Sequence, residues 1–326
     1  RPDGKVVDSM RLTPVAKRLE ELLGKKVTKT DDCIGDTVKK TVAAMKHGDV
    51  VLLENLRFHS EEEKNDPAFA KALAALGDLY VNDAFSADYN VDASLVGITE
   101  FLPSYAGLLL EREVAMMDRV MQRPDRPLVV IIGGAKIDTK IDVVRRFLAE
   151  ADHVILGGAL ANTILHMQGI AVGKSIIDPE AIESVQGLDL TSPKLHMPVD
   201  AVVSSDPSGN GPTRVAPIGR LAGDEMILDV GPETRQLFDR IIHEAKMVVW
   251  NGPLGKVEAP VFAAGTRALV ESIARSGAFS ITGGGDSMTF LSQHRLMDKI
   301  SYVSTGGGTM LEYLSGKQLP AIEKLR

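Results

Sequence analysis

Short apolar runs that end in glycine clusters recur along the second half of this chain, and they restrict its fold more than any other feature. In one of them, Phe279-Ser-Ile-Thr282 is followed by Gly283, Gly284 and Gly285 and then by Asp286. We expect a strand, a glycine loop and a helix with Asp286 as its N-cap. Glycine lets a ligand approach the backbone closely, and the first N–H groups of a helix favour an anion. The stretch predicts a cradle for a phosphate or a metal–phosphate, although most such glycines only make turns.

The same pattern repeats, which favours the functional interpretation. Further glycine clusters follow apolar runs at Gly133-Gly134, at Gly157-Gly158 and at Gly306-Gly307-Gly308, and Asn251-Gly252-Pro253 follows Met247-Val-Val-Trp250. Strand patterns alternate with helix patterns, which predicts an α/β architecture with right-handed crossovers. We therefore expect the glycine loops to form one edge of a parallel sheet.

Composition limits the class of protein. With 326 residues the chain is longer than a usual single core, so we expect two domains. A hydrophobic fraction of 44% with 25% charged residues is that of an ordinary soluble globular protein, and no run is long enough to span a membrane. The net charge of -7 argues against nucleic-acid or anionic-membrane partners. The single cysteine, Cys33, favours a reducing compartment and is predicted to be a buried packing residue.

A long helical pattern rich in Leu and Met indicates the domain boundary. We expect a first lobe at residues 1–105, a connecting helix at 106–122, a second lobe at 123–310 and a C-terminal tail at 311–326 that returns toward the first lobe. Within the first lobe, the acidic run 61–63 is predicted to be a solvated helix start.

Two lysines follow the first glycine pair of the second lobe. If Asp138 caps the next helix, Lys136 and Lys140 lie near one face of its first turn. Cations at a helix N-terminus are unfavourable unless an anion lies between them. The alternative is a pair of solvated surface lysines, but the preceding glycines favour phosphate contact. Similarly, Glu258 could hydrogen-bond ribose hydroxyls or simply begin a helix.

Several catalytic classes are disfavoured by missing motifs. The chain has no Gly-x-Gly-x-x-Gly opening a βαβ unit, no P-loop, no His/Cys metal spacing and no Gly-x-Ser-x-Gly elbow. Chemistry with an already anionic nucleophile remains. Phosphoryl transfer between a carboxylate and a nucleotide needs only positioning and charge neutralisation by lysine, arginine, helix N-termini and Mg²⁺.

Taken together, the motifs resemble those of phosphoglycerate kinase and occur in that family's order over essentially the whole chain. They are Arg1-Pro-Asp-Gly4, Leu12-Thr-Pro-Val15, Asp31-Asp-Cys-Ile-Gly35, Leu53-Glu-Asn-Leu-Arg-Phe58, Glu62-Glu-Lys-Asn-Asp66, Val81-Asn-Asp-Ala-Phe85, Gly133-Gly-Ala-Lys136, Asp229-Val-Gly-Pro232, Trp250-Asn-Gly-Pro253, Gly283-Gly-Gly-Asp286 and Ser304-Thr-Gly-Gly-Gly308. The resemblance implies two Rossmann-like α/β lobes with parallel sheets joined by a hinge helix, the first lobe being incomplete. It implies reversible phosphoryl transfer in glycolysis between 1,3-bisphosphoglycerate and Mg-ADP, giving 3-phosphoglycerate and ATP, by a cytoplasmic monomer.

The resemblance also implies roles for single residues. Arg1 and Arg57 match arginines that hold the triose phosphate, and Asp286 matches the ligand of the Mg-nucleotide. The other positions that match nucleotide-binding residues are Lys136, Lys140, Asn251, Glu258, Gly283, Gly284, Gly285 and Ser287. Catalytic roles fall to Lys136, Arg57 and Gly307, the last in a loop that resembles the one facing the substrate.

Two departures from the family pattern carry expectations of their own. The family begins with a strand–helix–strand segment that contains Asp-Phe-Asn, an essential arginine and His-Leu-Gly, and none of it precedes Arg1 here. The chain as given is therefore expected to be inactive, with a poorly stable first lobe. The family's His-Arg-x-His segment is also changed, because Asn90 replaces the arginine while Tyr89 and Asp92 replace the histidines. This exchange predicts weaker anion binding.

Two other functions stay open at this stage. A nucleotide-binding relative with weak or no kinase activity would keep the second lobe's residues and lose the triose-phosphate site. A nicotinamide-dependent dehydrogenase is disfavoured by the missing dinucleotide fingerprint. Separate titrations with Mg-ADP and with 3-phosphoglycerate discriminate the kinase from the relative.

Overall fold

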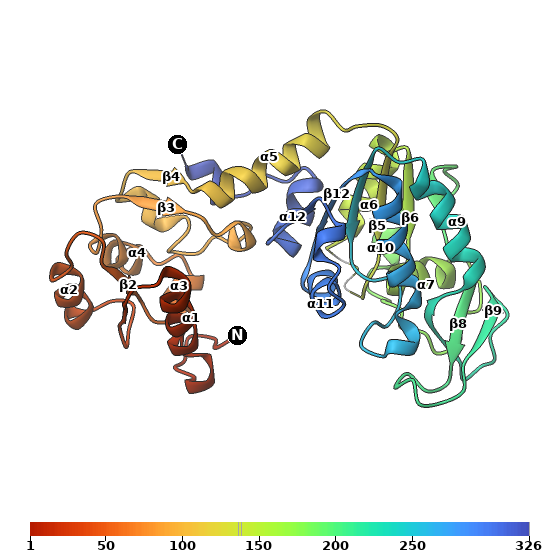
Figure 1. Ribbon diagram of the computed structural model, residues 1–326, viewed down its shortest axis with the longest axis horizontal. Helices are drawn as coiled ribbons and strands as arrows, with labels where there is room; N and C mark the ends of the chain where they lie inside the picture. Colours follow the sequence, from red (N-terminus) through yellow and green to blue (C-terminus); the bar gives the residue numbers. More distant parts are fainter. Residues whose placement is uncertain (136, 138, 326) are drawn as a thin grey trace. The chain divides into compact units, whose positions relative to one another are not determined.

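A computed structural model of the protein describes residues 1–135, 137 and 139–325. The chain divides into two compact units, both built from helices and strands (Figure 1). Unit 1 comprises Arg1–Glu111 and Gln318–Arg326, and unit 2 comprises Arg112–Lys317. The boundary falls within helix α5 (Leu108–Gln122). The expected connecting helix at 106–122 thus begins two residues later, because Ala106 ends a strand.

Unit 1 contains short helices and two separate two-stranded sheets. Its elements are α1 (Thr13–Leu23), β1 (Val27–Lys29), α2 (Asp36–Ala43), β2 (Val50–Leu52), α3 (Ser60–Glu63), α4 (Pro67–Ala74), β3 (Tyr80–Asn82) and β4 (Ser104–Ala106). β1 pairs with β2 and β3 pairs with β4, both in parallel. Local sequence sets the helix ends: the Asp66 carboxylate accepts from two N–H groups of α4, and Pro67 occupies its first position.

The core of unit 1 confirms the prediction for Cys33 and contradicts the one for Glu62. Cys33 is fully buried beside Phe69, and burial raises the pKa of its thiol to about 12, so it is a packing residue as predicted. Glu62, in contrast, is not part of a solvated acidic run. It is only 3% exposed, and its carboxylate accepts hydrogen bonds from the N–H and the hydroxyl of Ser94. The prediction for residues 61–63 was wrong at this position because Glu62 anchors a distant loop.

Unit 2 is a doubly wound α/β unit with a second, smaller sheet. Its elements after α5 are β5 (Leu128–Ile132), α6 (Ile141–Glu150), β6 (His153–Leu156), α7 (Gly158–Met167), α8 (Ile182–Gln186), β7 (Leu195–His196), β8 (Asp200–Ser204), β9 (Arg214–Pro217), β10 (Met226–Val230), α9 (Pro232–His243), β11 (Met247–Asn251), α10 (Ala264–Ser276), β12 (Phe279–Gly283), α11 (Gly285–Gln293), β13 (Tyr302–Val303) and α12 (Gly307–Leu314). The main sheet has the order β13-β12-β11-β5-β6-β7, and all its strand pairs are parallel.

The strand order of this sheet reverses at its centre. From β5 the chain proceeds outward through β6 and β7, and it later returns to pair β11 with β5 before proceeding the other way. β5 and β11 are buried along their whole length, as their apolar sequences predict for central parallel strands. Ligands of open α/β sheets bind where the strand order reverses, beyond the carboxyl ends of the strands. In this unit that point lies at the loops after β5 and β11.

The smaller sheet was not predicted. β8 pairs antiparallel with both β9 and β10, whereas only parallel sheets were expected. Neither β9 nor β10 was expected from the sequence. β9 is exposed at three of its four residues, and β10 is only partly buried at its start, so neither shows the continuous apolar run of a central strand.

Helix α5 is bound through one acidic side chain in each unit. In unit 1 the Asp83 carboxylate accepts from the N–H groups of Leu109 and Leu110, at 2.8 and 2.9 Å. In unit 2 the fully buried Glu113 carboxylate accepts from the Ser304 hydroxyl and the Thr305 N–H, at 2.8 and 2.7 Å. The sequence assigned no role to Glu113.

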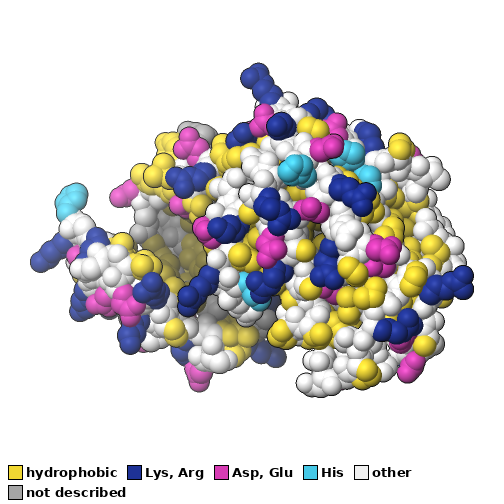
Figure 2. Space-filling model, turned by 45° about the vertical axis from the view of Figure 1, so that its right-hand side comes forward, with side chains coloured by type: hydrophobic (Ala, Val, Ile, Leu, Met, Phe, Trp, Pro, Cys, Tyr) yellow, Lys and Arg dark blue, Asp and Glu magenta, His cyan; other side chains and the backbone are white. Residues whose placement is uncertain are grey.

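The surface carries both signs of charge. On the face shown in Figure 2, Lys and Arg side chains are interspersed with Asp and Glu. Across the residues that the structure describes, we find no helix with the length and apolar character that a membrane span requires.

Candidate functional site

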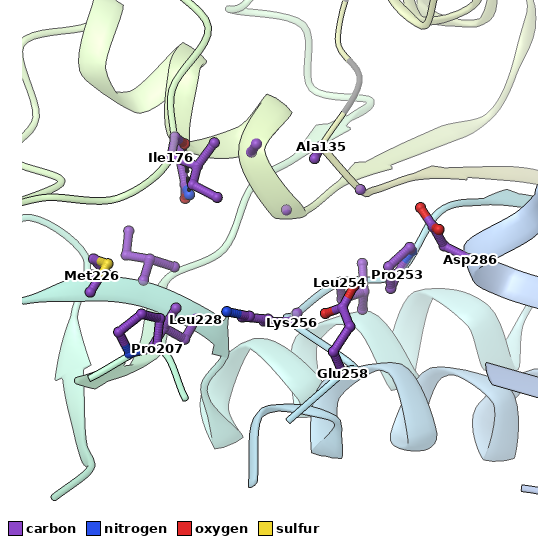
Figure 3. A pocket seen from close by; sticks show the side chains of 16 residues that line it. Ala135, Ile176, Pro207, Met226, Leu228, Pro253, Leu254, Lys256, Glu258 and Asp286 are labelled. Atoms are coloured by element: carbon purple, nitrogen blue, oxygen red, sulfur yellow. Dashed lines mark hydrogen bonds between the residues drawn. The ribbon is translucent and has the colours of Figure 1, made fainter. Parts of the chain in front are cut away.

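A cavity of about 340 Å³ opens in unit 2 at the carboxyl ends of the main sheet (Figure 3). Its floor is formed by the glycine loops after β5, β6 and β11, and one wall comes from β10 of the smaller sheet. The apolar part of the lining includes Ile176, Met226, Leu228 and Leu254. Among the described residues, the charged side chains in the lining are those of Lys256, Glu258 and Asp286. The cavity is therefore apolar at one side and charged at the other.

The glycines of these loops are required for the loops to pack against one another. A Cβ at Gly133 would lie 2.8 Å from the carbonyl oxygen of Gly252, and a Cβ at Gly158 would lie 2.6 Å from the backbone nitrogen of Gly134. Gly252 and Gly158 also have positive φ, of 85° and 61°. The three strand-end loops can approach this closely only because the residues at their contact points are glycines. From the sequence, these glycines are expected to let a ligand approach the backbone. In the structure they let the backbones of neighbouring loops approach one another.

The central glycine cluster differs from its predicted geometry. α11 begins at Gly285, and Gly284 with φ 107° is its N-cap residue, so Asp286 lies in the first turn and is not the N-cap. A Cβ at Gly283 would lie 2.8 Å from the Met310 sulfur, whereas one at Gly285 would meet no atom within 4 Å. Of the three glycines, Gly285 alone leaves open space above its backbone.

Asn251 and Ser287 tie the neighbouring loops together. The Asn251 side-chain amide donates to the carbonyl of Gly283 at 2.8 Å, and the fully buried Ser287 hydroxyl accepts from the N–H of Gly252 at 3.0 Å. Neither side chain belongs to the cavity lining. Their role in nucleotide binding stays a prediction. Their hydrogen bonds hold the loops after β11 and β12 together.

Of the two predicted lysines, the structure describes only Lys140. Lys136, like Asp138, lies outside the described residues. Lys140 occupies the N-cap position of α6, is 6% exposed, and donates from its ammonium to the carbonyl of Gly133. It is thus not a solvated surface lysine. A Cβ at Gly134 would lie 2.8 Å from the Lys140 Nζ, and both Gly134 and Asp286 line the cavity, so Lys140 and Asp286 lie on the same side of unit 2.

Glu258 and Asp286 are both presented to solvent in the cavity. Figure 3 shows their side chains extending from the segment after β11 and from α11. Both residues are exposed, and neither carboxylate forms a hydrogen bond or ion pair with any residue that the structure describes. Exposed carboxylate oxygens are suitable Mg²⁺ ligands, so Asp286 fits the predicted role. Lys256 is a charged lining residue to which the sequence assigned no nucleotide contact.

Gly307 is brought to the same group of loops. It begins α12, and a Cβ on it would lie 2.7 Å from the Cα of Gly284. The loop after β13 therefore packs on the loop after β12. The Glu113 carboxylate fixes this loop by accepting from both the N–H and the hydroxyl of Thr305.

In unit 1, the two predicted substrate arginines lie beside the same carboxylate. Arg57 forms an ion pair with Glu63, and the guanidinium of Arg1 is 3.8 Å from that carboxylate. Arg57 also donates to the Asp92 carboxylate at 2.7 Å, and Arg1 donates to the Tyr89 hydroxyl at 3.4 Å. Of the three residues that depart from the family pattern, Tyr89 and Asp92 thus contact the arginines directly, whereas the Asn90 amide donates to the carbonyl of Ala87.

Comparison with known proteins gives one consistent result. The family model described as phosphoglycerate kinase matches residues 1–317. The phosphoglycerate kinases of Moorella thermoacetica and Pelotomaculum thermopropionicum are 45% and 43% identical over the whole chain, which covers 84% of each of them. The solved phosphoglycerate kinase of Coxiella burnetii superposes with a TM-score of 0.83 at 36% identity, over 99% of this chain and 83% of that one. That of Pyrococcus horikoshii gives 0.86 at 31% identity, over 97% and 82%.

Proposed function

This chain belongs to the phosphoglycerate kinase family, and we propose that it serves that family's reaction with a nucleotide site in unit 2 and a triose-phosphate site in unit 1. The reaction is the reversible glycolytic transfer of a phosphoryl group between 1,3-bisphosphoglycerate and ADP, giving 3-phosphoglycerate and ATP. The cavity at the strand-order reversal is the observation that carries the assignment of the nucleotide.

The cavity lining suits the parts of a nucleotide. The apolar wall of Met226 and Leu228 would take the base, and Glu258 would accept hydrogen bonds from the ribose hydroxyls. The phosphates would extend toward the N-terminus of α11, where Gly285 leaves the backbone accessible. Asn251, Gly283, Gly284 and Ser287 would hold this loop in shape, and Lys136 and Lys140 would supply positive charge.

Magnesium is part of the proposal. Asp286 would hold the ion, because its carboxylate is exposed in the cavity and has no partner among the described residues. When bound, Mg²⁺ neutralises charge on the nucleotide phosphates. A cytoplasmic location and a monomeric state also belong to the proposal, and the single cysteine of the chain suits a reducing compartment.

The chemistry asks little more of the protein than positioning. The acceptor in the ATP-consuming direction is a carboxylate, which is already anionic and requires no general base. The lysines and the free N–H groups at α11 would stabilise charge on the phosphoryl oxygens. Among the proposed catalytic residues, Lys136 would contact the transferring group, Arg57 would orient the triose phosphate, and Gly307 would give its loop a backbone without a side chain.

Trp250 provides the test of the nucleotide site. It is the only tryptophan, it is fully buried, and its indole N–H donates to the carbonyl of Gly252 in the cavity floor at 2.7 Å. We expect Mg-ADP to change its fluorescence, and Asp286→Asn to weaken Mg-ADP binding at least tenfold. Asp224→Asn, at another exposed aspartate of unit 2, is the matched control. Equal Mg-ADP affinity in both variants would remove Asp286 from the site.

A second candidate is a nucleotide-binding member of the family with weak or no kinase activity. The observation that favours it is the pairing of Arg57 with two carboxylates in unit 1. Calorimetric titrations with Mg-ADP and with 3-phosphoglycerate separate the two functions. Binding of both ligands supports the kinase even when 3-phosphoglycerate binds weakly, whereas tight binding of Mg-ADP with no binding of 3-phosphoglycerate supports the second candidate.

A further inference from the structure

Arg57 is surrounded by carboxylates of its own chain. One terminal nitrogen of its guanidinium pairs with Glu63, and the other donates to Asp92 at 2.7 Å. The Arg57 side chain is 21% exposed and that of Asp92 is 8% exposed, so the Asp92 contact is shielded from water. Both terminal nitrogens, which would form a bidentate contact with a phosphate, are therefore already in use.

The segment around Asp92 holds this carboxylate firmly in place. The carbonyl oxygen of Asp92 accepts from the N–H groups of Leu95 and Val96, at 3.1 and 2.8 Å. Ser94, two residues later, is bound through its N–H and hydroxyl to the buried Glu62 carboxylate. On the other side, the Asn90 amide donates to the carbonyl of Ala87 at 3.0 Å. Asp92 is thus a fixed counter-charge, and Asn90 makes a local contact.

The charges of this cluster balance. Arg1 and Arg57 contribute two positive charges, and Glu63 and Asp92 contribute two negative ones. Tyr89 adds a neutral phenol that accepts from Arg1. A phosphate dianion that approaches Arg57 must displace a carboxylate and then remain beside it, which like-charge repulsion opposes. The cluster therefore has little net attraction for a phosphate group.

We propose that Asp92, assisted by Glu63, is a specificity-determining residue that occupies the anion-binding edge of Arg57 and weakens the binding of phosphate-bearing acids in unit 1. This inference rests on the proposed function, because it assumes that Arg57 belongs to a triose-phosphate site. It goes beyond that function by assigning the discrimination against the phosphate group to two named carboxylates.

The test is calorimetric titration of the chain with 3-phosphoglycerate and, separately, with glycerate, which lacks the phosphate. The variants are Asp92→Asn, Glu63→Gln and the double variant Asn90→Arg/Asp92→Asn. We expect 3-phosphoglycerate to bind at least tenfold more tightly to Asp92→Asn than to the unaltered chain, and more tightly still to the double variant. The affinity for glycerate should change less than threefold, because only the phosphate meets the removed charge.

Asp78→Asn is the matched control, because it removes one negative charge at an exposed position of unit 1 away from the arginines. It should leave the affinity for 3-phosphoglycerate unchanged, whereas an equal gain would mean that net charge alone is responsible and would overturn the proposal. Far-UV circular dichroism checks the folding of each variant. If Asp92→Asn does not fold, Glu63→Gln takes its place, because Glu63 is more exposed and pairs with the same guanidinium.

The outcomes separate this inference from the proposed function. Tight binding of 3-phosphoglycerate by the unaltered chain, or no gain in any variant while Mg-ADP still binds, overturns the role of Asp92 and leaves the nucleotide site intact. Failure of Mg-ADP to bind contradicts the proposed function in unit 2, whatever the variants of unit 1 do. A gain confined to 3-phosphoglycerate supports the proposal.

Discussion

Asp88 is a buried acid for which the proposed reaction has no use. It is fully buried in unit 1, where one carboxylate oxygen accepts from the Asn82 amide at 2.7 Å. The other oxygen has no hydrogen-bond partner among the described residues. Burial raises the pKa of Asp88 from 3.8 to about 6. Burial therefore favours the protonated form of this carboxyl more than water does.

Replacing Asp88 by Asn should change the pH dependence of stability. Because its folded pKa is raised, Asp88 contributes stability that is fully present below its unfolded pKa near 3.8 and is lost as pH rises through about 6. At pH 7.5, Asp88→Asn should increase the free energy of unfolding of unit 1 by roughly 1 to 3 kcal/mol. At pH 4 the difference should shrink toward zero. Urea unfolding followed by far-UV circular dichroism measures this, and an equal effect at both pH values would contradict it.

Two glycines of unit 2 should separate ligand approach from loop packing. Gly285→Ala adds a methyl group in open space, so unit 2 should keep its stability while the affinity for Mg-ADP falls. Gly133→Ala places a methyl group 2.8 Å from the carbonyl of Gly252, so unit 2 should lose roughly 1 to 3 kcal/mol of stability. Urea unfolding followed by Trp250 fluorescence and titration with Mg-ADP give the two readouts. Unchanged Mg-ADP affinity in Gly285→Ala would place the phosphates elsewhere.

At the scale of residues, the sequence predicted which residues line the cavity better than it predicted their contacts. Asp286 and Glu258 were singled out and both line the cavity, because carboxylates beside glycine loops are a local signal. Lys140 was expected to contact a phosphate, with a solvated surface lysine as the alternative; it is buried against the carbonyl of Gly133, a contact that depends on how the loops fold together. The pairing of Arg57 with Asp92 joins residues 35 positions apart, and only the folded chain brings them together.

At the scale of elements, long buried strands were predicted well and short amphipathic ones poorly. β5 and β11 are continuous apolar runs, and β11 lies within one residue of the apolar run seen at 247–250 in the sequence. β9 and β10 were missed although β10 provides the apolar wall of the cavity. Their burial depends on pairing with β8, which has no local sequence signal. The repeated glycine clusters could reveal the floor of the site, but not this wall.

A buried carboxylate of α5, that of Glu113, helps to attach this helix within unit 2. Glu113 accepts hydrogen bonds from Ser304 and Thr305, which precede the loop of Gly307. Glu113→Gln replaces one acceptor oxygen by a donor that faces other donors, so unit 2 should lose about 1 to 3 kcal/mol of stability. Urea unfolding followed by Trp250 fluorescence measures the loss.

A matched control for this prediction is available on the same helix. Glu111→Gln changes an exposed glutamate of α5 and should leave the stability of unit 2 unchanged. Mg-ADP affinity should stay within about threefold in both variants, because Glu113 does not line the cavity. If Glu113→Gln were as stable as Glu111→Gln, the buried carboxylate would not be what holds this loop.

At the scale of the whole molecule, the two units differ in the number of strands in their sheets and in how well those strands are buried. The sheets of unit 1 are two-stranded, and Val81 of β3 and Tyr105 of β4 are 49% and 44% exposed. Two-stranded sheets are marginal in isolation, and parallel strands are normally covered on both faces. In unit 2 the six-stranded sheet buries its central strands completely. Unit 1 should therefore unfold at a lower denaturant concentration than unit 2.

This difference predicts two separate unfolding transitions and a ligand effect on only one of them. Far-UV circular dichroism should report both transitions in urea, whereas Trp250 fluorescence should report only the second, because Trp250 lies in the core of unit 2. Mg-ADP at 100 times its dissociation constant should stabilise the second transition by about 2.7 kcal/mol, since a ligand that binds only the folded unit stabilises it in proportion to the logarithm of the ligand concentration relative to that constant. The first transition should stay where it was, as the proposed nucleotide cavity is lined entirely by residues of unit 2. A single transition seen identically by both probes, and moved as a whole by Mg-ADP, would show that the chain unfolds as one cooperative body.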